Sequence, residues 1–356
     1  MRRRWAIVST GRISQDFARA LLIAGSTVAA VSSRSQDAAD AFGEQFGVGA
    51  RGRFVGFEAM IAANGDGALF DVVYVATPHA SHVHDTLLSL NCRIPVLCEK
   101  PMVVSAPQLI RCISVAREKR VFLSEGMWTR CFPLTRELNE LINVKKSIGH
   151  VRHVSGTFGW YDSLQQRRMT ELIDAGGALL EVGVYLLFMA SLGLGGFHNH
   201  APTRVHATAV LGSTGCDMQT NMAIESPGGT ADLMCSFLSP LPNEFFFYGT
   251  HGTIRVHDAF HAPTVATIAL CDRDKFGVVH TRVANHPIDG AQDGDSKAFN
   301  FHNSRGLIYE IRAVEAAIAS GKLELDEVPL AESLAIAKVM DQIRAQIGVA
   351  FGHVEH

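Results

Sequence analysis

The sequence predicts a two-domain chain in which a doubly wound parallel α/β sheet comes first and an α+β domain with an open, predominantly antiparallel sheet follows. The chain has 356 residues, which is more than one compact core usually holds, and 47% of them are hydrophobic. The spacing of the apolar runs also changes near residue 126. We therefore expect residues 1–125 to form the first domain and residues 126–356 the second.

Short β-branched or aromatic runs alternate with helix-length stretches over the first 125 residues. Strands that alternate with helices form right-handed βαβ units, so their sheet is parallel. Residues that begin and end helices agree with this pattern. Gly25 can end the helical run that begins at Gln15, and Ser105 forms a capping box with Gln108. The expected strands are Trp5–Ser9, Val28–Ser32, Val72–Ala76, Pro95–Glu99 and Val121–Glu125.

The second half begins with helical patterns at Leu134–Val144 and Gly177–Leu194 and closes with two more at Ser304–Ser320 and Ala331–Ile347. Between them, strand-like runs are joined by short turns that contain Gly, Pro or Asn, which indicates an antiparallel sheet. Helices on one side of an open sheet leave its other face exposed, so we expect a homodimer through this sheet. The expected strands are Arg204–Leu211, Met218–Ile224, Thr230–Phe237, Glu244–Tyr248 and Thr253–His257.

The composition of the chain argues against several classes of binding partner and of sequence segment. Lys and Arg total 32 against 35 Asp and Glu, for a formal net charge of -3, and no run of five like charges occurs, so we expect no nucleic-acid partner. The apolar run after Arg4 is only five residues long, so we expect neither a signal sequence nor a membrane segment. The seven cysteines include no Cys-x-x-Cys pair, which favours reduced cytoplasmic thiols over disulfides or a zinc site.

The tetrapeptide Cys98-Glu99-Lys100-Pro101 closes the apolar run Ile94–Leu97 and so places a lysine where a buried strand ends. In open α/β sheets, ligands bind at that end of the strands. Pro101 stops the strand and disfavours helix at Lys100, which holds the ammonium group beside the expected ligand crevice. A catalytic or cofactor-binding lysine fits this position, and a surface lysine after an edge strand is the alternative.

The turn Ser9-Thr10-Gly11-Arg12-Ile13-Ser14 follows the first expected strand, where a dinucleotide fingerprint would place three glycines. Only the middle glycine, Gly11, is present, at the position where the backbone must approach a pyrophosphate. The helical run Gln15–Ala24 comes next, so its N-terminal amides could bind phosphate. A glycine-containing turn without a ligand is the alternative.

The second expected strand ends in Ser32-Ser33-Arg34-Ser35, about twenty residues after Gly11. Sites that select NAD usually carry an acid there, because a carboxylate accepts hydrogen bonds from the adenosine ribose and repels a 2'-phosphate. Arg34 and the two flanking serine hydroxyls instead offer donors to that phosphate, which indicates NADP. A solvated arginine at a helix start is the alternative.

A histidine-rich segment, Thr77–His84, follows the strand Val72–Ala76 and so lies at the same ligand-bearing edge. We do not expect a metal site, because His82 and His84 point apart on a helix and no carboxylate or thiolate stands at ligand spacing. We expect Thr77 and Pro78 to line the nicotinamide side, while His82 packs or hydrogen-bonds at the helix start.

In the second domain, the stretch Gly176–Tyr185 opens a helix with glycines that let another backbone or a cofactor ring come close. Glu181 and Tyr185 are four residues apart, which puts an acid and a phenol on one helix face. A tyrosine has an ordinary pKa of about 10, so it can act as a base near neutral pH only beside a cation, and Lys100 could supply that charge across a domain cleft. A core tyrosine with a satisfied hydroxyl is the alternative.

Together these stretches resemble the glucose-fructose oxidoreductase and inositol dehydrogenase family (Gfo/Idh/MocA), over essentially the whole chain. The subgroup of dimeric dihydrodiol dehydrogenase and NADP-dependent D-xylose 1-dehydrogenase is most similar. The resemblance implies a Rossmann-type first domain and hydride transfer to NADP from a carbinol carbon of a D-xylose-like aldose or a trans-dihydrodiol. The stretches that carry it are Trp5–Ser14, Val96–Pro101, Trp128–Pro133 and Gly177–Leu180.

The resemblance also implies residue roles. Lys100 would contact the nicotinamide ribose and stabilise a tyrosinate, Tyr185 would be the acid/base, and Glu181 would act beside it. Arg168 would join Glu181 and Tyr185 in contacting the substrate. The expected cofactor contacts are Ser9, Gly11, Arg12, Ile13, Ser33, Arg34, Thr77, Pro78, His82, Glu99, Lys100, Trp128 and Arg130.

Two departures from the family pattern leave alternatives open. The family usually has aspartate where this chain has Glu181, and the extra methylene can change how a substrate is oriented. Ser14 replaces the third small residue of the phosphate loop, which a serine can fill without much strain. The alternatives are an NADP(H)-binding sensor without turnover and a dehydrogenase of another sugar or of inositol.

Overall fold

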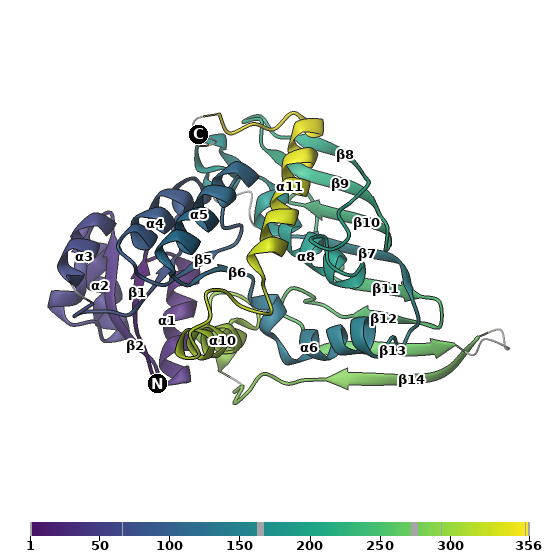
Figure 1. The fold of residues 1–356 in the computed structure, drawn as a ribbon, viewed down its shortest axis with the longest axis horizontal. Helices are drawn as coiled ribbons and strands as arrows, with labels where there is room; N and C mark the ends of the chain where they lie inside the picture. Colours follow the sequence, from purple (N-terminus) through teal and green to yellow (C-terminus); the bar gives the residue numbers. More distant parts are fainter. Residues whose placement is uncertain are drawn as a thin grey trace. The chain divides into compact units, whose positions relative to one another are not determined.

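The computed structural model describes residues 2–65, 67–161, 167–271, 277–292, 294–352 and 354. The chain divides into two compact units (Figure 1). Unit 1 contains Met1–Val103, Pro107–Trp128 and Ile288–Leu330, and unit 2 contains Val104–Ala106, Thr129–Pro287 and Ala331–His356.

Unit 1 has a six-stranded sheet in the order β3-β2-β1-β4-β5-β6, in which every neighbouring pair is parallel. The order steps outward in both directions from β1 and β4, which confirms the predicted doubly wound sheet. Only β3 was not predicted, because three residues are too few to show a strand pattern. The strands are β1 Arg4–Val8, β2 Thr27–Ser33, β3 Arg53–Val55, β4 Val72–Val75, β5 Val96–Glu99 and β6 Leu123–Gly126.

Buried aromatic side chains fix the first helix on this sheet. Phe17 of α1 stacks on Tyr74 of β4 with ring centroids 3.6 Å apart, and Trp5 of β1 meets Phe17 edge-on at 5.4 Å. The helices of this part are α1 Arg12–Ala24, α2 Gln36–Phe46, η1 Ala50–Gly52, α3 Phe57–Asn64, α4 His79–Asn91, α5 Ala106–Lys119, η2 Trp128–Cys131, α9 Asp295–Ala298, η7 Ser304–Gly306 and α10 Leu307–Ala319.

The segment 288–330 returns to unit 1, whereas the sequence suggested a single boundary near residue 125. Its helix α10 lies beside α1 (Figure 1). Glu315 of α10 accepts hydrogen bonds from the Trp5 indole at 3.0 Å and from the Ser26 hydroxyl at 2.6 Å. These bonds join residues that are about 300 positions apart, which no local sequence pattern reveals.

Unit 2 has an eight-stranded sheet in the order β14-β13-β12-β11-β7-β10-β9-β8. Only the β7 and β10 pair is parallel, so the predicted antiparallel character is confirmed. The sequence did not indicate β7, β13 or β14. The strands are β7 Val151–Gly159, β8 Arg204–Leu211, β9 Asp217–Ser226, β10 Gly229–Ser236, β11 Phe245–Gly249, β12 Gly252–Val256, β13 Val265–Cys271 and β14 Val278–Asn285.

All ten residues of α8 are buried, and it packs on the sheet of unit 2 against β7, β10 and β11. The helical stretch Leu172–Gly193 is long and apolar enough to span a membrane by length and composition, but 83% of its most apolar window is buried, as in a core helix. The helices of unit 2 are α6 Pro133–Asn139, η3 Glu140–Val144, α7 Arg167–Thr170, η5 Leu172–Asp174, η6 Leu179–Gly183, α8 Val184–Gly193 and α11 Leu330–Ile347.

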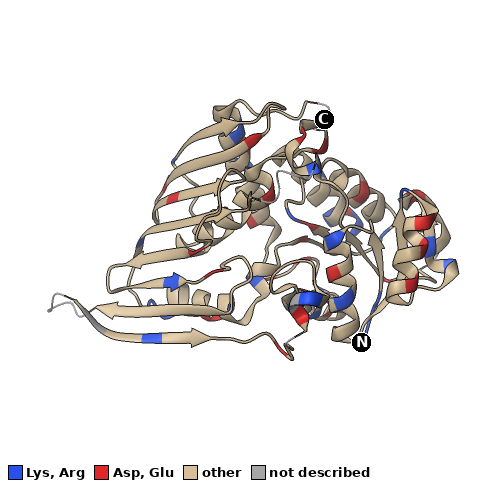
Figure 2. Cartoon of the chain, turned by 180° about the vertical axis from the view of Figure 1, so that it is seen from behind, with Lys and Arg blue, Asp and Glu red and all other residues tan. Residues whose placement is uncertain are grey.

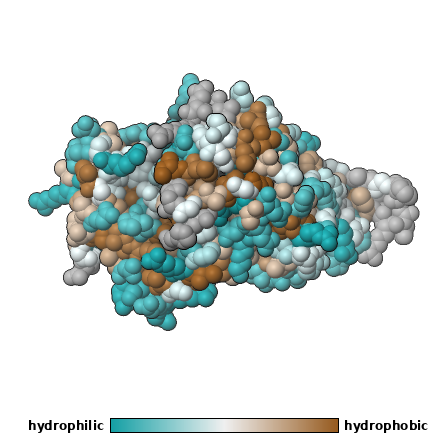
Figure 3. Space-filling model, turned by 90° about the horizontal axis from the view of Figure 1, so that it is seen from above, coloured by the Kyte–Doolittle hydropathy of each residue, from teal (hydrophilic) through white to brown (hydrophobic). Residues whose placement is uncertain are grey.

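Burial alternates along the strands of unit 2. In β10, Ala231, Leu233 and Cys235 are buried, while Thr230 before them and Asp232 between them are exposed. One sheet face therefore packs on helices and the other faces outward. Charged residues are sparse along this sheet (Figure 2), and apolar residues form separate patches on the face of the molecule seen in Figure 3.

Candidate active site

The turn between β1 and α1 leaves a helix N-terminus open for an anion. Gly11 is the N-cap of α1, no side chain caps the first amides, and the first turn contains no acidic residue. The Gly11 amide donates to the Ser9 hydroxyl at 3.2 Å. Unclaimed amides at the positive end of a helix bind phosphate. Of the predicted phosphate-binding residues, Ser9 and Gly11 lie in this turn, and Arg12 and Ile13 lie in the first turn of α1.

The end of β2 presents an exposed cation at the expected adenosine position. Ser33 ends the strand, and its hydroxyl lies 3.5 Å from that of Thr10 in the phosphate turn. Ser35 is the N-cap of α2, where its hydroxyl oxygen accepts from the Ala38 amide. Arg34 is exposed, and no carboxylate in the described ranges pairs with it. Its donors are therefore available to an anionic ligand.

His82 links two loops at the carboxyl edge of the sheet. Its Nδ1 lies 2.9 Å from the Pro101 carbonyl oxygen and its Nε2 lies 2.8 Å from the Thr77 carbonyl oxygen. Burial, and secondarily the nearby His79, lowers the pKa of His82 to about 4, so the ring is neutral at neutral pH. The expected bond at the helix start is present, and the ring also braces the loop that carries Lys100.

Thr77, predicted to line the nicotinamide side, has its hydroxyl engaged within the same unit. It donates to Asp85 of α4 at 2.8 Å. Pro78 is the N-cap residue of α4, where no side chain caps the first amides. This loop therefore offers its backbone and the apolar surface of Pro78 to a ligand more readily than the Thr77 hydroxyl.

Buried carboxyl groups hold the backbone around Lys100. The strand β5 ends at Glu99, and the Lys100–Pro101 peptide is cis. Glu99 accepts hydrogen bonds from the Tyr74 hydroxyl at 2.5 Å and from the Lys100 amide at 3.2 Å, and Glu125 accepts one from the Met102 amide at 3.0 Å. These contacts make Glu99 a support for the loop, and its expected contact with the cofactor stays a prediction.

A third carboxyl group, Glu310 of α10, is fully buried near Glu99 and Glu125. Burial, reinforced by the two neighbouring carboxylates, raises the pKa of Glu310 well above its ordinary value. The shift favours the neutral acid, which reduces like-charge repulsion with Glu99 and Glu125. No sequence pattern pointed to Glu310.

Trp128 and Arg130, both expected at the cofactor, fall in different units. Trp128 is buried at the end of unit 1. Arg130 lies in unit 2, where its guanidinium donates to the Phe188 carbonyl of α8 at 3.2 Å. Burial lowers the pKa of Arg130. Arg130 therefore braces α8 within unit 2.

The glycines before the second candidate helix make room for a carboxylate of the same chain. Gly177 has φ +130°, and a Cβ there would lie 2.1 Å from Asp217 Oδ1. Asp217 is fully buried and accepts from the Leu179 amide at 2.7 Å and the Thr220 hydroxyl at 2.8 Å. Burial raises the pKa of Asp217 to about 6. The sequence suggested that another backbone or a cofactor ring approaches these glycines, and at Gly177 the close neighbour is instead the Asp217 carboxylate.

Glu181 lies in the π-helical turn η6, and Tyr185 lies in the first turn of α8. Glu181 is buried and accepts a hydrogen bond from Arg168, whose side chain is 43% exposed. The structure therefore brings together two of the three predicted substrate-binding residues.

Tyr185 is nearly buried and lies among aromatic side chains. Its ring centroid is 5.8 Å from Phe158 of β7 and 5.6 Å from His261, and His261 stacks on Phe158 at 4.5 Å. The Thr129 hydroxyl donates to the His261 carbonyl. Sequence reasoning missed Phe158 and His261, because neither stands in a motif. Their rings pack around the ring of Tyr185.

No group of three His, Cys, Asp or Glu side chains within the described ranges is arranged to hold a metal ion. The cysteines of the chain form no disulfide, and those that are buried are Cys98, Cys112, Cys131, Cys216 and Cys235.

Two family models match the two halves of the chain. The NAD-binding Rossmann fold of the Gfo/Idh/MocA oxidoreductases matches residues 3–127, and a C-terminal domain of the same family matches residues 135–255. The chain belongs to the Gfo/Idh/MocA oxidoreductase family. This confirms the resemblance drawn from the sequence, the Rossmann-type first domain and the oxidoreductase class.

Full-length members of the Gfo/Idh/MocA family are similar to this chain. The trans-1,2-dihydrobenzene-1,2-diol dehydrogenase of Mus musculus is 32% identical over 352 residues, covering 98% of both chains. The Bos taurus protein of that name is 31% identical over 357 residues, covering 99% of both.

Solved structures share the fold. One is a 3-ketoreductase from Actinomadura kijaniata in complex with NADP and TDP-benzene, with a TM-score of 0.77, 24% identity and 98% coverage of both chains. Another is an aldose-aldose oxidoreductase from Caulobacter crescentus complexed with glycerol, with a TM-score of 0.78, 20% identity and 97% coverage of both.

Proposed function

We propose that this chain is an NADP-dependent dehydrogenase that oxidises a carbinol carbon of a D-xylose-like aldose or a trans-dihydrodiol. The observation that carries the proposal is Lys100 at the carboxyl end of β5, on a backbone held by Glu99, in a chain of an oxidoreductase family. The names of the full-length relatives favour a dihydrodiol. Tyr185, whose ring lies among aromatic side chains, is the second ionisable group of this proposal.

The residues of unit 1 fit NADP. The uncapped N-terminus of α1 would bind the pyrophosphate, and Arg34 would bind the 2'-phosphate through donors that no described carboxylate occupies. The cofactor, when bound, supplies the acceptor for the hydride. An acidic residue at the position of Arg34 would instead favour NAD.

Proton and hydride leave the substrate together in this proposal. The phenolate oxygen of Tyr185 removes the proton from the substrate hydroxyl. At the same time the C–H bond of the carbinol carbon breaks, and its electron pair leaves with the hydrogen as hydride. The alcohol thereby becomes a carbonyl. The Lys100 ammonium stabilises the tyrosinate and orients the ribose. Arg168 and Glu181, which contact each other, bind the other hydroxyl groups of the substrate.

The experiment that tests the proposal is the rate of NADPH formation by the purified protein with D-xylose, D-glucose, myo-inositol and a trans-dihydrodiol. We expect turnover with D-xylose or the dihydrodiol, and little with NAD. Turnover only with glucose or inositol would contradict the substrate class and leave another sugar dehydrogenase. NADPH binding without turnover on any of them would favour the alternative, an NADP(H)-binding sensor.

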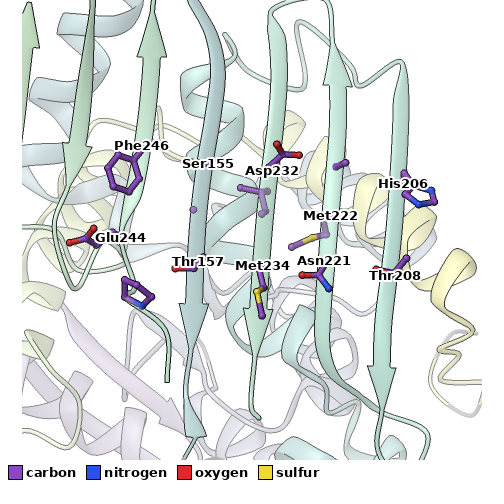
Figure 4. Close-up of a pocket in the computed structure, with 14 residues that line it drawn as sticks. Ser155, Thr157, His206, Thr208, Asn221, Met222, Asp232, Met234, Glu244 and Phe246 are labelled. Carbon is purple, nitrogen blue, oxygen red and sulfur yellow. The ribbon is translucent and has the colours of Figure 1, made fainter. Parts of the chain in front are cut away.

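We also propose that the chain forms a homodimer through the outer face of the sheet of unit 2. Side chains from neighbouring strands line a hollow of about 620 Å³ on this face (Figure 4). A two-fold axis would place the same patch of both subunits against each other. The lining side chains include Ser155, Asn221, Asp232, Met234, Glu244 and Phe246.

Size-exclusion chromatography with light scattering tests the dimer. We expect twice the chain mass for the wild-type protein and one chain mass for Met234→Arg, because a charge inside the interface costs more than the contact contributes. Leu22→Arg, on the exposed side of α1, is the control that should remain dimeric. A monomeric wild-type protein would contradict this part of the proposal.

A further inference from the structure

The returning segment of unit 1 is fastened to α1 through a buried carboxyl group. Asp16 of α1 is fully buried, and its two oxygens accept hydrogen bonds from a segment 284 residues away. The Asn300 amide lies 2.8 and 3.0 Å from the two oxygens, the Asn300 side-chain nitrogen lies 2.9 Å from Oδ1, and the Phe301 amide lies 3.0 Å from Oδ2. We name residues 300–301 the strap.

The strap also holds Arg12, the first residue of α1. The Asn300 side chain donates to the Arg12 carbonyl at 3.1 Å, and the Arg12 guanidinium donates to the Asn300 carbonyl at 3.3 Å. The guanidinium carbon lies 4.9 Å from the centre of the Phe301 ring. Hydrogen bonds and a cation–π contact therefore hold the arginine from one side.

The charge of Arg12 is not neutralised by this arrangement. A carbonyl and an aromatic ring are its contacts, and no carboxylate in the described part of the chain pairs with it. A guanidinium has five N–H donors, and the strap uses one. Arg12 directly follows Gly11, the N-cap of the helix whose first amides are open. Its remaining donors are thus available where a phosphate would bind.

We propose that Asp16 and Asn300 are positioning residues that fix Arg12 for the pyrophosphate of the dinucleotide. This inference rests on the proposed NADP-dependent function. An arginine side chain that is already held loses less conformational entropy when it binds a ligand. The strap therefore makes a segment near the end of unit 1 a determinant of how tightly the cofactor is held, although it does not itself need to touch the cofactor.

The test is a double-mutant cycle on NADPH affinity, measured by fluorescence titration of the full chain with NADPH and with adenosine 2'-monophosphate. Adenosine 2'-monophosphate has the 2'-phosphate but no pyrophosphate. The variants are Arg12→Ala, Asn300→Ala and the double variant. Asn300→Ala keeps both backbone bonds to Asp16, so the strap should stay folded. Arg312→Ala, which removes an exposed ion pair of the same segment, is the matched control.

We expect Arg12→Ala to weaken NADPH binding roughly tenfold and Asn300→Ala roughly fivefold. Since Asn300 acts through Arg12, the double variant should bind no more weakly than Arg12→Ala. Binding of adenosine 2'-monophosphate should be unchanged in all of them, and Arg312→Ala should match the wild type. Phe301→Leu is a second probe, which should raise the NADPH dissociation rate without affecting adenosine 2'-monophosphate.

Effects that multiply in the double variant would overturn the inference, as would unchanged NADPH affinity in Arg12→Ala or Asn300→Ala. A parallel loss of adenosine 2'-monophosphate affinity would also overturn it, because it would indicate a general structural effect on unit 1. Failure of the proposed function is distinguishable from these results, since the wild-type protein would then bind neither NADPH nor adenosine 2'-monophosphate.

Discussion

Arg168 donates a hydrogen bond to Glu181. The Arg168 side chain is 43% exposed, and the Glu181 side chain is 5% exposed. The carboxylate that stands at the family's aspartate position is thus paired with a cation of the same unit. The contact links the π-helical turn before Tyr185 to α7. The pair therefore bears on both the stability of unit 2 and the binding of substrate.

Replacing Arg168 with Met should reduce the free energy of unfolding by about 1–2 kcal/mol, because it leaves a buried carboxylate without its cation. The KM for substrate should rise as well. Urea unfolding and steady-state kinetics measure the two effects. Adding Glu181→Gln to Arg168→Met should recover much of the stability but not the KM. Unchanged stability and KM in Arg168→Met would show that the pair has no role.

Replacing Lys100 with Met should lower kcat/KM by a factor of about 100 or more, since the charge that stabilises the tyrosinate is lost. NADPH binding should persist, because the phosphate-binding residues are unchanged. The measurements are NADP reduction rates and thermal unfolding. Lys145→Met, at an exposed position of unit 2, is the control with full activity. A fully active Lys100→Met protein would refute the role of this lysine.

Arg34→Ala should weaken NADP binding by roughly 10- to 100-fold and leave NAD binding nearly unchanged, because only NADP has the 2'-phosphate. The affinities for both cofactors, measured in parallel, give the selectivity ratio. The loss for NADP should shrink at high salt, since exposed charges are screened. Equal losses for NAD and NADP would contradict the assignment of Arg34.

Asp217 predicts a pH dependence of stability. Its pKa in the folded protein is about 6, above the ordinary value of 3.8, so folding disfavours the charged form. The stabilising contribution of the neutral acid is complete below about pH 4 and is lost as pH rises through about 6. Relative to Asp217→Asn, the wild-type protein should lose roughly 3 kcal/mol over this range, as measured by urea unfolding at a series of pH values. A difference independent of pH would contradict the account.

Local sequence patterns predicted the strands and helices that have long apolar runs with clear ends. The strand that ends at Glu99 and the helix that carries Tyr185 have long apolar runs bounded by Pro or Gly, and both are found where expected. The strand Val151–Gly159 was missed because it contains Ser, Gly and Thr between its apolar residues. It nevertheless lies at the centre of the sheet, where neighbouring strands determine its conformation.

The supports of the candidate site could not be predicted, because each joins residues that are far apart in sequence. Glu310 lies beneath the Lys100 loop, and Asn300 binds the first turns of α1, although neither belongs to a recognisable motif. The neighbour of Gly177 could not be predicted either. The sequence indicated that another group lies close to this glycine, but only the fold shows that this group is Asp217.

We propose that Tyr185 removes the substrate proton during hydride transfer to NADP. The most direct measurement is the initial rate of NADPH formation by the wild-type protein and by Tyr185→Phe, with D-xylose and a trans-dihydrodiol, alongside NADPH affinity. We expect wild-type turnover, a loss of about 100-fold or more in Tyr185→Phe, and equal NADPH affinity in the two proteins. Turnover by Tyr185→Phe at the wild-type rate would contradict the account.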